Sequence, residues 1–261
     1  MKYCKTIWIT GSSDGLGLLA AGELVRAGHR VILHARNPER ARWAMQQVPG
    51  AKDVLVGDLS NLEEVKQLAE AANQIGPFDV VIHNAGVYQA SPQHIFMVNV
   101  LAPYVLTNLL FKPERLIYLS SDMHWQGKPL INLDPDRVSY ADSKLYVLML
   151  CLAVARLWPS VLANAVNPGW VPTKMGGSRA PDNLKKGYET QVWLAVHNES
   201  EAMVSGKYFF HQKPQPFHPD ASNETLQDHL LEQCEKLSGV VFHENTRVNK
   251  KKYSQTNQTR N

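Results

Sequence analysis

The chain has 261 residues, with 27 Lys and Arg against 24 Asp and Glu. This length suits one large domain with a substantial core, and a formal charge of +3 with scattered basic residues argues against a nucleic-acid surface. The three cysteines, Cys4, Cys151 and Cys234, have neither metal-ligand nor disulfide-framework spacing. We therefore expect a protein of a reducing compartment without a structural metal.

No apolar run approaches the roughly 18 residues that are needed to span a bilayer. The longest run, residues 145–157, contains Arg156 and is followed by Pro159. No signal-peptide pattern precedes the first strand. We expect a cytoplasmic protein that has no membrane span.

Short strands and helices alternate along most of the chain. The strands are rich in β-branched and aromatic residues, and they are predicted at 5–10, 30–34, 53–57, 78–83, 115–121, 161–166 and 205–210. Helices are predicted at 18–27, 38–47, 62–74, 184–197 and 223–237, with a further buried helix over 145–157 that starts near Tyr140. Such alternation predicts a single α/β domain, a doubly wound (Rossmann) parallel sheet with helices on both faces.

A glycine-rich turn follows the first predicted strand. It reads Gly11-Ser-Ser-Asp-Gly-Leu-Gly17 and opens the first helix, with the second strand completing the unit within about 30 residues. Residues without side chains let a pyrophosphate approach the backbone, and a helix start supplies free N–H groups. The turn therefore predicts a dinucleotide site; a tight connection without a ligand is the alternative.

The second predicted strand ends in His34-Ala-Arg36. NAD-dependent folds commonly place an acidic residue here to bind the ribose 2′-hydroxyl. A guanidinium suits a 2′-phosphate instead, so Arg36 predicts that NADP(H) is favoured over NAD(H). The alternative is a surface arginine that opens the loop before Asn37-Pro38.

Tyr140 and Lys144 are four residues apart at the start of the buried helix. Side chains at i and i+4 share one helix face. A fixed positive charge near a phenol favours the phenolate and lowers its pKa. The pair is therefore predicted to act as a general acid and base on a substrate oxygen.

Four motifs, taken in order, resemble the short-chain dehydrogenase/reductase family. They are Thr10-Gly with Gly15-x-Gly17, His83-Asn-Ala-Gly86, Tyr140-x-x-x-Lys144 and Pro168-Gly-x-x-x-Thr173. The resemblance covers residues 10 to about 237, and the carboxyl end looks like the retinol-dehydrogenase-like branch. The chain departs from the pattern at His83, where Asn is usual, and at Asp14, where many NADP-using relatives carry a basic residue.

The resemblance implies a seven-stranded parallel sheet and hydride transfer between a nicotinamide and a carbonyl or alcohol carbon. Tyr140 would exchange a proton with the substrate oxygen, Ser121 would hydrogen-bond that oxygen, and Ser120 would support the strand. Lys144 would lower the pKa of Tyr140 and hold the ribose, and Asn99, on a helix over residues 98–107, would position a water. Implied cofactor contacts are Gly11, Ser13, Gly15, Leu16, Gly17, Arg36, Asp58, Leu59, Asn84, Ala85, Gly86, Tyr140, Lys144, Pro168, Gly169, Val171 and Thr173.

Apolar side chains gather near the expected mouth of the substrate pocket. They are Tyr88, Met123, Trp125, Trp170 and Met175. Such a lining predicts a lipophilic or aromatic aldehyde or ketone as substrate, most often in the reductive direction. The alternative is that several of these residues only pack a lid.

The predicted domain spans residues 1–240, with a substrate lid at about 172–200 and a polar tail at 241–261. A homodimer or homotetramer is possible through the helices that start at Asn99 and Tyr140. Two rival functions remain. An epimerase of the extended family would need Gly-x-x-Gly-x-x-Gly and a larger carboxyl domain, and a non-catalytic NADP(H)-sensing regulator would be expected to lose Tyr140, Lys144 or the glycine turn.

Overall fold

The computed structural model describes residues 4–129 and 133–243. Over these residues the strands form one sheet in the order β3-β2-β1-β4-β5-β6-β7-β8, parallel except for the last pair. The strands are β1 Thr6–Ile9, β2 Arg30–Ala35, β3 Asp53–Val56, β4 Val80–His83, β5 Arg115–Leu119, β6 Leu162–Asn167, β7 Lys207–Phe210 and β8 Lys213–Pro214. The predicted doubly wound fold is confirmed.

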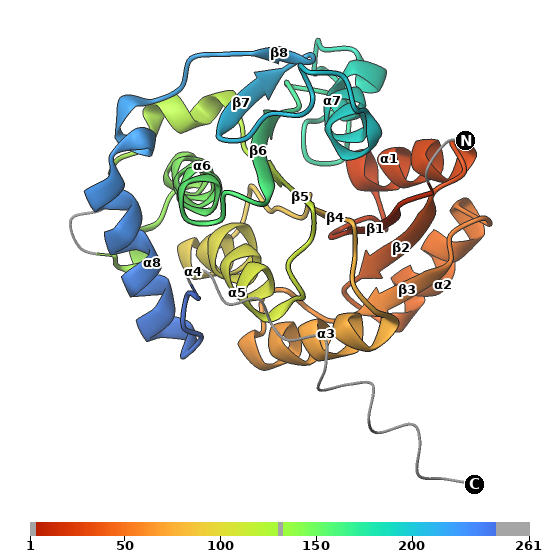
Figure 1. Ribbon diagram of the computed structural model, residues 1–261, viewed down its shortest axis with the longest axis horizontal. Coiled ribbons are helices and arrows are strands. Elements are labelled where there is room, and N and C mark those ends of the chain that lie inside the picture. Colours follow the sequence, from red (N-terminus) through yellow and green to blue (C-terminus); the bar gives the residue numbers. More distant parts are fainter. Residues whose placement is uncertain (1–3, 130–132, 244–261) are drawn as a thin grey trace, which may run out of the picture.

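Helices cover both faces of the sheet (Figure 1). The main helices are α1 Gly15–Arg26, α2 Pro38–Gln47, α3 Leu62–Ile75, α4 Pro92–Phe96, α5 Ala102–Leu109, α6 Tyr140–Leu157, α7 Leu184–Val196 and α8 Glu224–Ser238. One apolar cluster joins α1, α2 and α7 to one face, and another joins α3, α5 and α6 to the other. The strands between them are apolar on both faces, as parallel sheets require.

The sheet has eight strands among the described residues, and the prediction of seven was wrong by one short hairpin strand. β7 ends at Phe210, and the next two residues, His211 and Gln212, have φ of 48° and 63°. Two left-handed residues in succession make the tight turn that pairs antiparallel strands. Neither residue is the Gly or Asn that signals such a turn, so the sequence does not predict the two-residue strand β8.

Helix α3 is capped by Asn61, whose Oδ1 accepts from the backbone N–H groups of Glu63 and Glu64. One local prediction also changes. The helix expected over residues 98–107 is α5 preceded by a π-helical turn, Met97–Leu101, which contains the buried Asn99. In the loop over residues 122–139, the described part contains two short 3₁₀ helices, Asp122–Gln126 and Pro135–Arg137.

The last described residues, 240–243, pack over α5 and α6. The Tyr104 hydroxyl donates to the Val240 carbonyl (2.8 Å), and Trp158 Nε1 donates to the His243 carbonyl (2.9 Å). The Phe242 ring stacks on Trp158 with centroids 5.4 Å apart. Part of the surface that the homodimer prediction assigns to a second copy is therefore covered by the chain itself. Among the described residues, no helix is both long and apolar enough to cross a bilayer.

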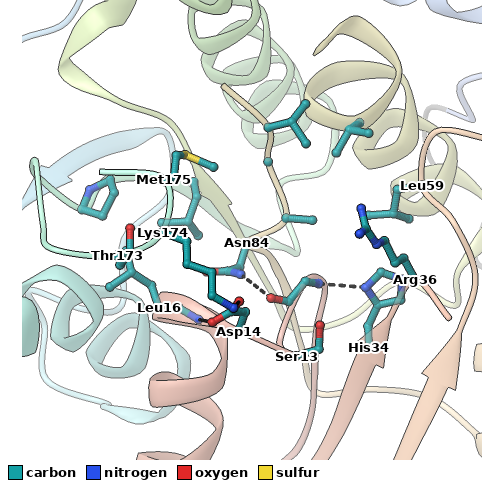
Figure 2. A pocket seen from close by; sticks show the side chains of 18 of the residues that line it. Ser13, Asp14, Leu16, His34, Arg36, Leu59, Asn84, Thr173, Lys174 and Met175 are labelled. Atoms are coloured by element: carbon teal, nitrogen blue, oxygen red, sulfur yellow. Dashed lines mark hydrogen bonds and ion pairs between the residues drawn. The ribbon is translucent and has the colours of Figure 1, made fainter. Parts of the chain in front are cut away.

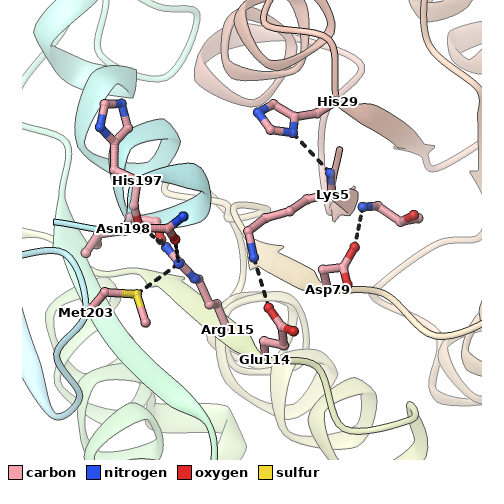
Figure 3. Close-up of polar contacts among 10 residues, drawn as sticks. Lys5, His29, Asp79, Glu114, Arg115, His197, Asn198 and Met203 are labelled. Atoms are coloured by element: carbon pink, nitrogen blue, oxygen red, sulfur yellow. Dashed lines mark hydrogen bonds and ion pairs between the residues drawn. The ribbon is translucent and has the colours of Figure 1, made fainter. Parts of the chain in front are cut away.

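A polar network ties the amino ends of the strands together, at the edge opposite the glycine turn (Figure 3). Lys5 Nζ donates to Glu114 at 2.9 Å. The buried Arg115 guanidinium donates to the carbonyls of Leu194 (2.8 Å) and His197 (2.6 Å). Arg115 thereby satisfies carbonyls at the carboxyl end of α7, which have no partner within the helix.

We expect Arg115→Met to lower the free energy of unfolding by about 3 kcal/mol, because two buried carbonyls lose a charged donor. Urea unfolding at pH 7.5 measures this change. Lys5→Met is the matched control. Its partner Glu114 is largely exposed, so its loss should cost less than about 1 kcal/mol. Equal effects of the two variants would contradict the role assigned to Arg115.

Candidate active site

The three glycines of the turn have different environments. A Cβ at Gly11 would lie 2.8 Å from Ala85 Cα, and one at Gly17 would lie 2.4 Å from Asn84 Nδ2. These two glycines let the turn pack against the loop that follows β4, where Asn84 Nδ2 also donates to the Thr10 carbonyl (3.0 Å). Of the three, only Gly15 is uncrowded: the nearest atom to its Cβ position is a Thr173 methyl at 3.9 Å, an ordinary contact distance. Gly15 is therefore where a ligand phosphate can approach the backbone.

A buried histidine that the sequence did not single out holds the turn. His34 Nδ1 accepts from Gly11 N–H (2.8 Å), and its Nε2 lies 2.9 Å from the Gly57 carbonyl. Because a backbone N–H points at Nδ1, the ring proton belongs on Nε2, which donates to Gly57. Burial lowers the pKa of His34 to about 4, so the neutral ring persists at neutral pH.

A second buried histidine lies at the carboxyl end of β4. His83 stacks on Tyr118 with ring centroids 4.8 Å apart, and its Nε2 is 3.1 Å from Thr107 Oγ1. Burial lowers the pKa of His83 to about 3. The residue that departs from the family motif is thus part of the core packing.

We expect these two histidines to make the fold sensitive to acid. Each has a folded-state pKa below its unfolded value near 6.5, so the unfolded state binds more protons below that pH. Stability should therefore fall as the pH drops from about 6.5 towards 4, by on the order of 3 kcal/mol for His34 alone. Urea unfolding at pH 7.5, 6 and 4.5 tests this. His83→Asn should flatten the curve, and an unchanged slope would contradict the assignment.

A cavity of about 390 Å³ lies over the turn and the ends of β1, β2 and β4 (Figure 2). Lys174 Nζ lies 2.6 Å from Asp14 Oδ2, and Arg40 Nη2 lies 3.1 Å from the same atom. Partial burial acts to raise the pKa of Asp14, but hydrogen bonds from Lys174, Gly15 and Arg40 outweigh it and lower that pKa. Asp14, the acidic residue that departs from the family pattern, is thus paired with two cationic side chains.

Arg36 lies at the exposed edge of the same cavity. Its guanidinium makes no hydrogen bond or ion pair with any other residue of 4–129 or 133–243. Arg40, which sequence reasoning missed, also lines the cavity and donates through Nε to Ser13 Oγ (3.2 Å). Arg40 lies four residues after Arg36, in the first turn of α2.

Tyr140 lies where this cavity meets a larger one, and Lys144 lines the smaller cavity alone. Lys144 is buried, and its Nζ donates to the Leu119 carbonyl (2.8 Å), 5.3 Å from the centroid of the Tyr140 ring. Burial lowers the pKa of Lys144 to about 8. Burial also raises the pKa of Tyr140 to about 12, although a hydrogen bond with Ser121 acts to lower it. The expected lowering of the Tyr140 pKa by Lys144 is therefore wrong for this arrangement: desolvation dominates.

Asn99 fixes the loop that follows β4. Its Oδ1 accepts from Val87 N–H (2.8 Å), and its Nδ2 donates to the Val87 carbonyl (3.0 Å) and to Ser143 Oγ (3.0 Å). The Asn99 side chain is therefore bonded outside its own helix. A Cβ at Gly86 would lie 3.4 Å from Lys144 Nζ and 3.5 Å from Asn99 Oδ1, so both polar groups flank Gly86.

Ser121 caps the 3₁₀ helix that follows β5. Its Oγ accepts from Met123 N–H (3.2 Å), and its carbonyl accepts from His124 Nδ1 (2.7 Å). His124 is fully buried, and its Nε2 accepts from His218 N–H (3.2 Å). Sequence reasoning missed His124, which connects the serine to the carboxyl-terminal segment. Ser120 Oγ donates to the Lys144 carbonyl (2.8 Å), in keeping with a supporting role.

The larger cavity has a volume of about 880 Å³. The five side chains predicted at the substrate mouth all line it: Tyr88, Met123, Trp125, Trp170 and Met175. Tyr88 stands edge-on to Tyr140 with centroids 4.8 Å apart. Trp170 Nε1 donates to the Gly176 carbonyl (2.8 Å), so it packs its own loop as well. Sequence reasoning missed Tyr208, Phe210 and Gln215, which also line the cavity.

Most residues expected to contact the cofactor line the smaller cavity. They are Gly11, Ser13, Gly15, Leu16, Arg36, Asp58, Leu59, Asn84, Ala85, Gly86, Tyr140, Lys144, Pro168 and Thr173. Gly169 and Val171 line the larger cavity instead, and Gly17 and Asn99 line neither. Gly17 is required by packing against Asn84.

A parallel sheet with a glycine turn at its carboxyl edge, and two cavities that share Tyr140, define a dinucleotide-binding oxidoreductase. The family model described as short chain dehydrogenase matches residues 5–184. The chain therefore belongs to the short-chain dehydrogenase/reductase family.

Its relatives include proteins of the expected branch. The chain is 44% identical over 247 residues to an uncharacterized oxidoreductase of Emericella nidulans, covering 90% of this chain and 97% of that protein. It is 30% identical over 299 residues to human retinol dehydrogenase 14, covering 92% and 88%. Among solved structures, a short chain dehydrogenase from Shigella flexneri complexed with NADP is 25% identical, covers 80% of this chain and 97% of that one, and has a TM-score of 0.63.

Proposed function

We propose that this oxidoreductase uses NADP(H) to interconvert a lipophilic or aromatic aldehyde or ketone and its alcohol. The observation that carries the proposal is the meeting of the two cavities at Tyr140, which lines both. One cavity has the glycine turn and the other has the aromatic wall. A phenol at their junction can reach a substrate oxygen while the carbon bonded to that oxygen faces the cofactor.

The residues of the smaller cavity fit a phosphorylated dinucleotide. Gly15 leaves the backbone accessible where a Cβ would otherwise stand. Arg36 has no competing ion pair among the described residues, and Arg40, in the first turn of α2, lines the same cavity. Two guanidinium groups suit a 2′-phosphate, and the NADP complex of the Shigella relative agrees with this preference.

When bound, the nicotinamide cofactor supplies or accepts the hydride. Tyr140 holds the proton that the substrate oxygen gains or loses, and burial raises its pKa to about 12, so the phenol is protonated at neutral pH. A protonated phenol is the acid that carbonyl reduction requires, which supports the reductive direction. Ser121 donates a hydrogen bond to the same oxygen. Lys144 would hold the ribose, and Asn99, whose side chain bonds Val87 and Ser143, would hold the loop beside it.

The aromatic wall of the larger cavity supports a lipophilic substrate. Tyr88, Trp125 and Trp170 present exposed rings there, and apolar linings of this size bind drug-sized ligands. The relative named retinol dehydrogenase 14 agrees with a lipophilic substrate class. The rival function, a non-catalytic NADP(H) sensor, would use the smaller cavity alone and gives no reason for the hydrogen-bonded Ser121 and Tyr140 in the larger one.

Fluorescence titration with NADPH and NADH, followed by turnover of a panel of aryl ketones and aldehydes, tests the proposal. We expect tighter NADPH binding and NADPH-dependent reduction of at least one lipophilic carbonyl. Equal or tighter NADH binding would contradict the cofactor preference. Tight NADPH binding without turnover of any carbonyl or alcohol would favour the sensor.

A further inference from the structure

The larger cavity contains three charged residues, and they differ in what they contact. Lys174 is paired with Asp14 (2.6 Å). Asp182 Oδ2 accepts from the backbone N–H of Trp170 (2.6 Å), which fixes it to its own loop. Asp122, directly after Ser121, makes no hydrogen bond or ion pair through its carboxylate with any residue in the described part of the chain. Its charge is available to a ligand.

Aromatic side chains line the same cavity as this carboxylate. They are Tyr88, Trp125, Trp170, Tyr208 and Phe210. Asp122 lies close enough to Tyr208 to act on it: burial is the main cause of the raised pKa of Tyr208, and the charge of Asp122 adds to it. The carboxylate is thus beside the aromatic wall and is exposed to a ligand in the cavity.

A carboxylate among aromatic faces is the combination that binds organic ammonium ions. Ring faces attract a cation through their quadrupole, and the carboxylate supplies the opposite charge. A neutral ketone would use only the rings. A negatively charged substrate would be repelled, because Asp122 and Asp182 face the cavity and the one lysine there is already paired.

We propose that the preferred carbonyl substrates carry a protonated amine, bound by Asp122 and the neighbouring aromatic rings while Ser121 and Tyr140 contact the carbonyl oxygen. The inference rests on the proposed function and narrows its substrate class to lipophilic amino ketones or amino aldehydes.

A matched pair of aryl ketones tests this class. One has a dimethylaminomethyl substituent on the ring, and the other has a carbon in place of the nitrogen. The ratio of the two kcat/KM values should favour the amine by about tenfold, since cation–π and ion-pair contacts at exposed sites are each modest. Asp122→Asn should bring the ratio near one, and high salt should reduce it.

Asp136→Asn is the control variant. Asp136 also lies in the first turn of a 3₁₀ helix, where negative charge is favourable, but it lines neither cavity. It should keep the wild-type ratio. A ratio near one in the wild-type protein, or an equal ratio in wild type and Asp122→Asn, would overturn the inference.

Binding of benzyltrimethylammonium, followed by tryptophan fluorescence, separates this inference from the proposed function. Tight binding to the wild type that weakens about tenfold in Asp122→Asn supports the ammonium site. If no ketone is reduced in that case, the proposed reductase function fails while the ammonium site stands. Equal binding to both proteins overturns the ammonium site, whether or not ketones are reduced.

Discussion

Tyr140→Phe is expected to lower kcat by about 1,000-fold and to leave the dissociation constant for NADPH within about twofold. Phenylalanine keeps the ring that packs edge-on against Tyr88 and beneath Lys144. Only the hydroxyl is removed, and with it the proton that the substrate oxygen exchanges. Stopped-flow reduction of a ketone and fluorescence titration of NADPH give the two quantities separately.

Tyr88→Phe is the control for this prediction. Tyr88 lines the larger cavity and contacts the Tyr140 ring, but its hydroxyl takes no part in the proposed proton transfer. The control should change kcat by no more than a few-fold. Full turnover by Tyr140→Phe would contradict the mechanism, and a large loss of NADPH affinity would show that the hydroxyl acts through cofactor binding instead.

Arg36→Ala is expected to weaken NADPH binding by about 10- to 100-fold and to change NADH binding less than twofold. The two cofactors differ only in the 2′-phosphate, and a bidentate charged hydrogen bond is worth about 1.5–3 kcal/mol. Arg36 meets the requirements for such a bond, because it lines the cavity and no described residue pairs with its guanidinium. Fluorescence titration with both cofactors measures the change.

Arg30→Ala is the matched control, since Arg30 begins the strand that Arg36 follows. It carries the same charge but lies at the opposite end of β2 from the cavity, so both dissociation constants should remain near those of the wild type. An equal loss of NADPH affinity in both variants would show only a long-range charge effect. A loss of NADH affinity in Arg36→Ala would place the guanidinium on another part of the cofactor.

Elements with strong local signals were predicted well. The range of α2, residues 38–47, was correct at both ends, because Asn37 caps the helix and Pro38 suits its first turn. Strand β8 was missed because it is only two residues long and its turn uses His211 and Gln212. Asn61 and Ser60 are both good caps by residue type, so only the backbone geometry decided between them.

The candidate site shows the same division between local and long-range information. The motifs predicted Ser121, Tyr140 and Lys144 at the same edge of the sheet, where strand ends in a doubly wound fold meet; Ser121 lines the larger cavity, Lys144 the smaller one and Tyr140 both. His34, Arg40 and His124 were missed because their roles depend on partners brought close by the fold, such as Gly11, Ser13 and His218.

The sequence by itself determined the family, the doubly wound fold and the residues at the ends of its strands. These follow from hydrophobic periodicity, glycine placement and motif order, which are local properties of the sequence. Only the tertiary structure decided the ionisation of the site: burial sets the pKa of Tyr140 to about 12 and that of Lys144 to about 8. Desolvation depends on every group packed around a charge, and those groups come from distant strands and helices.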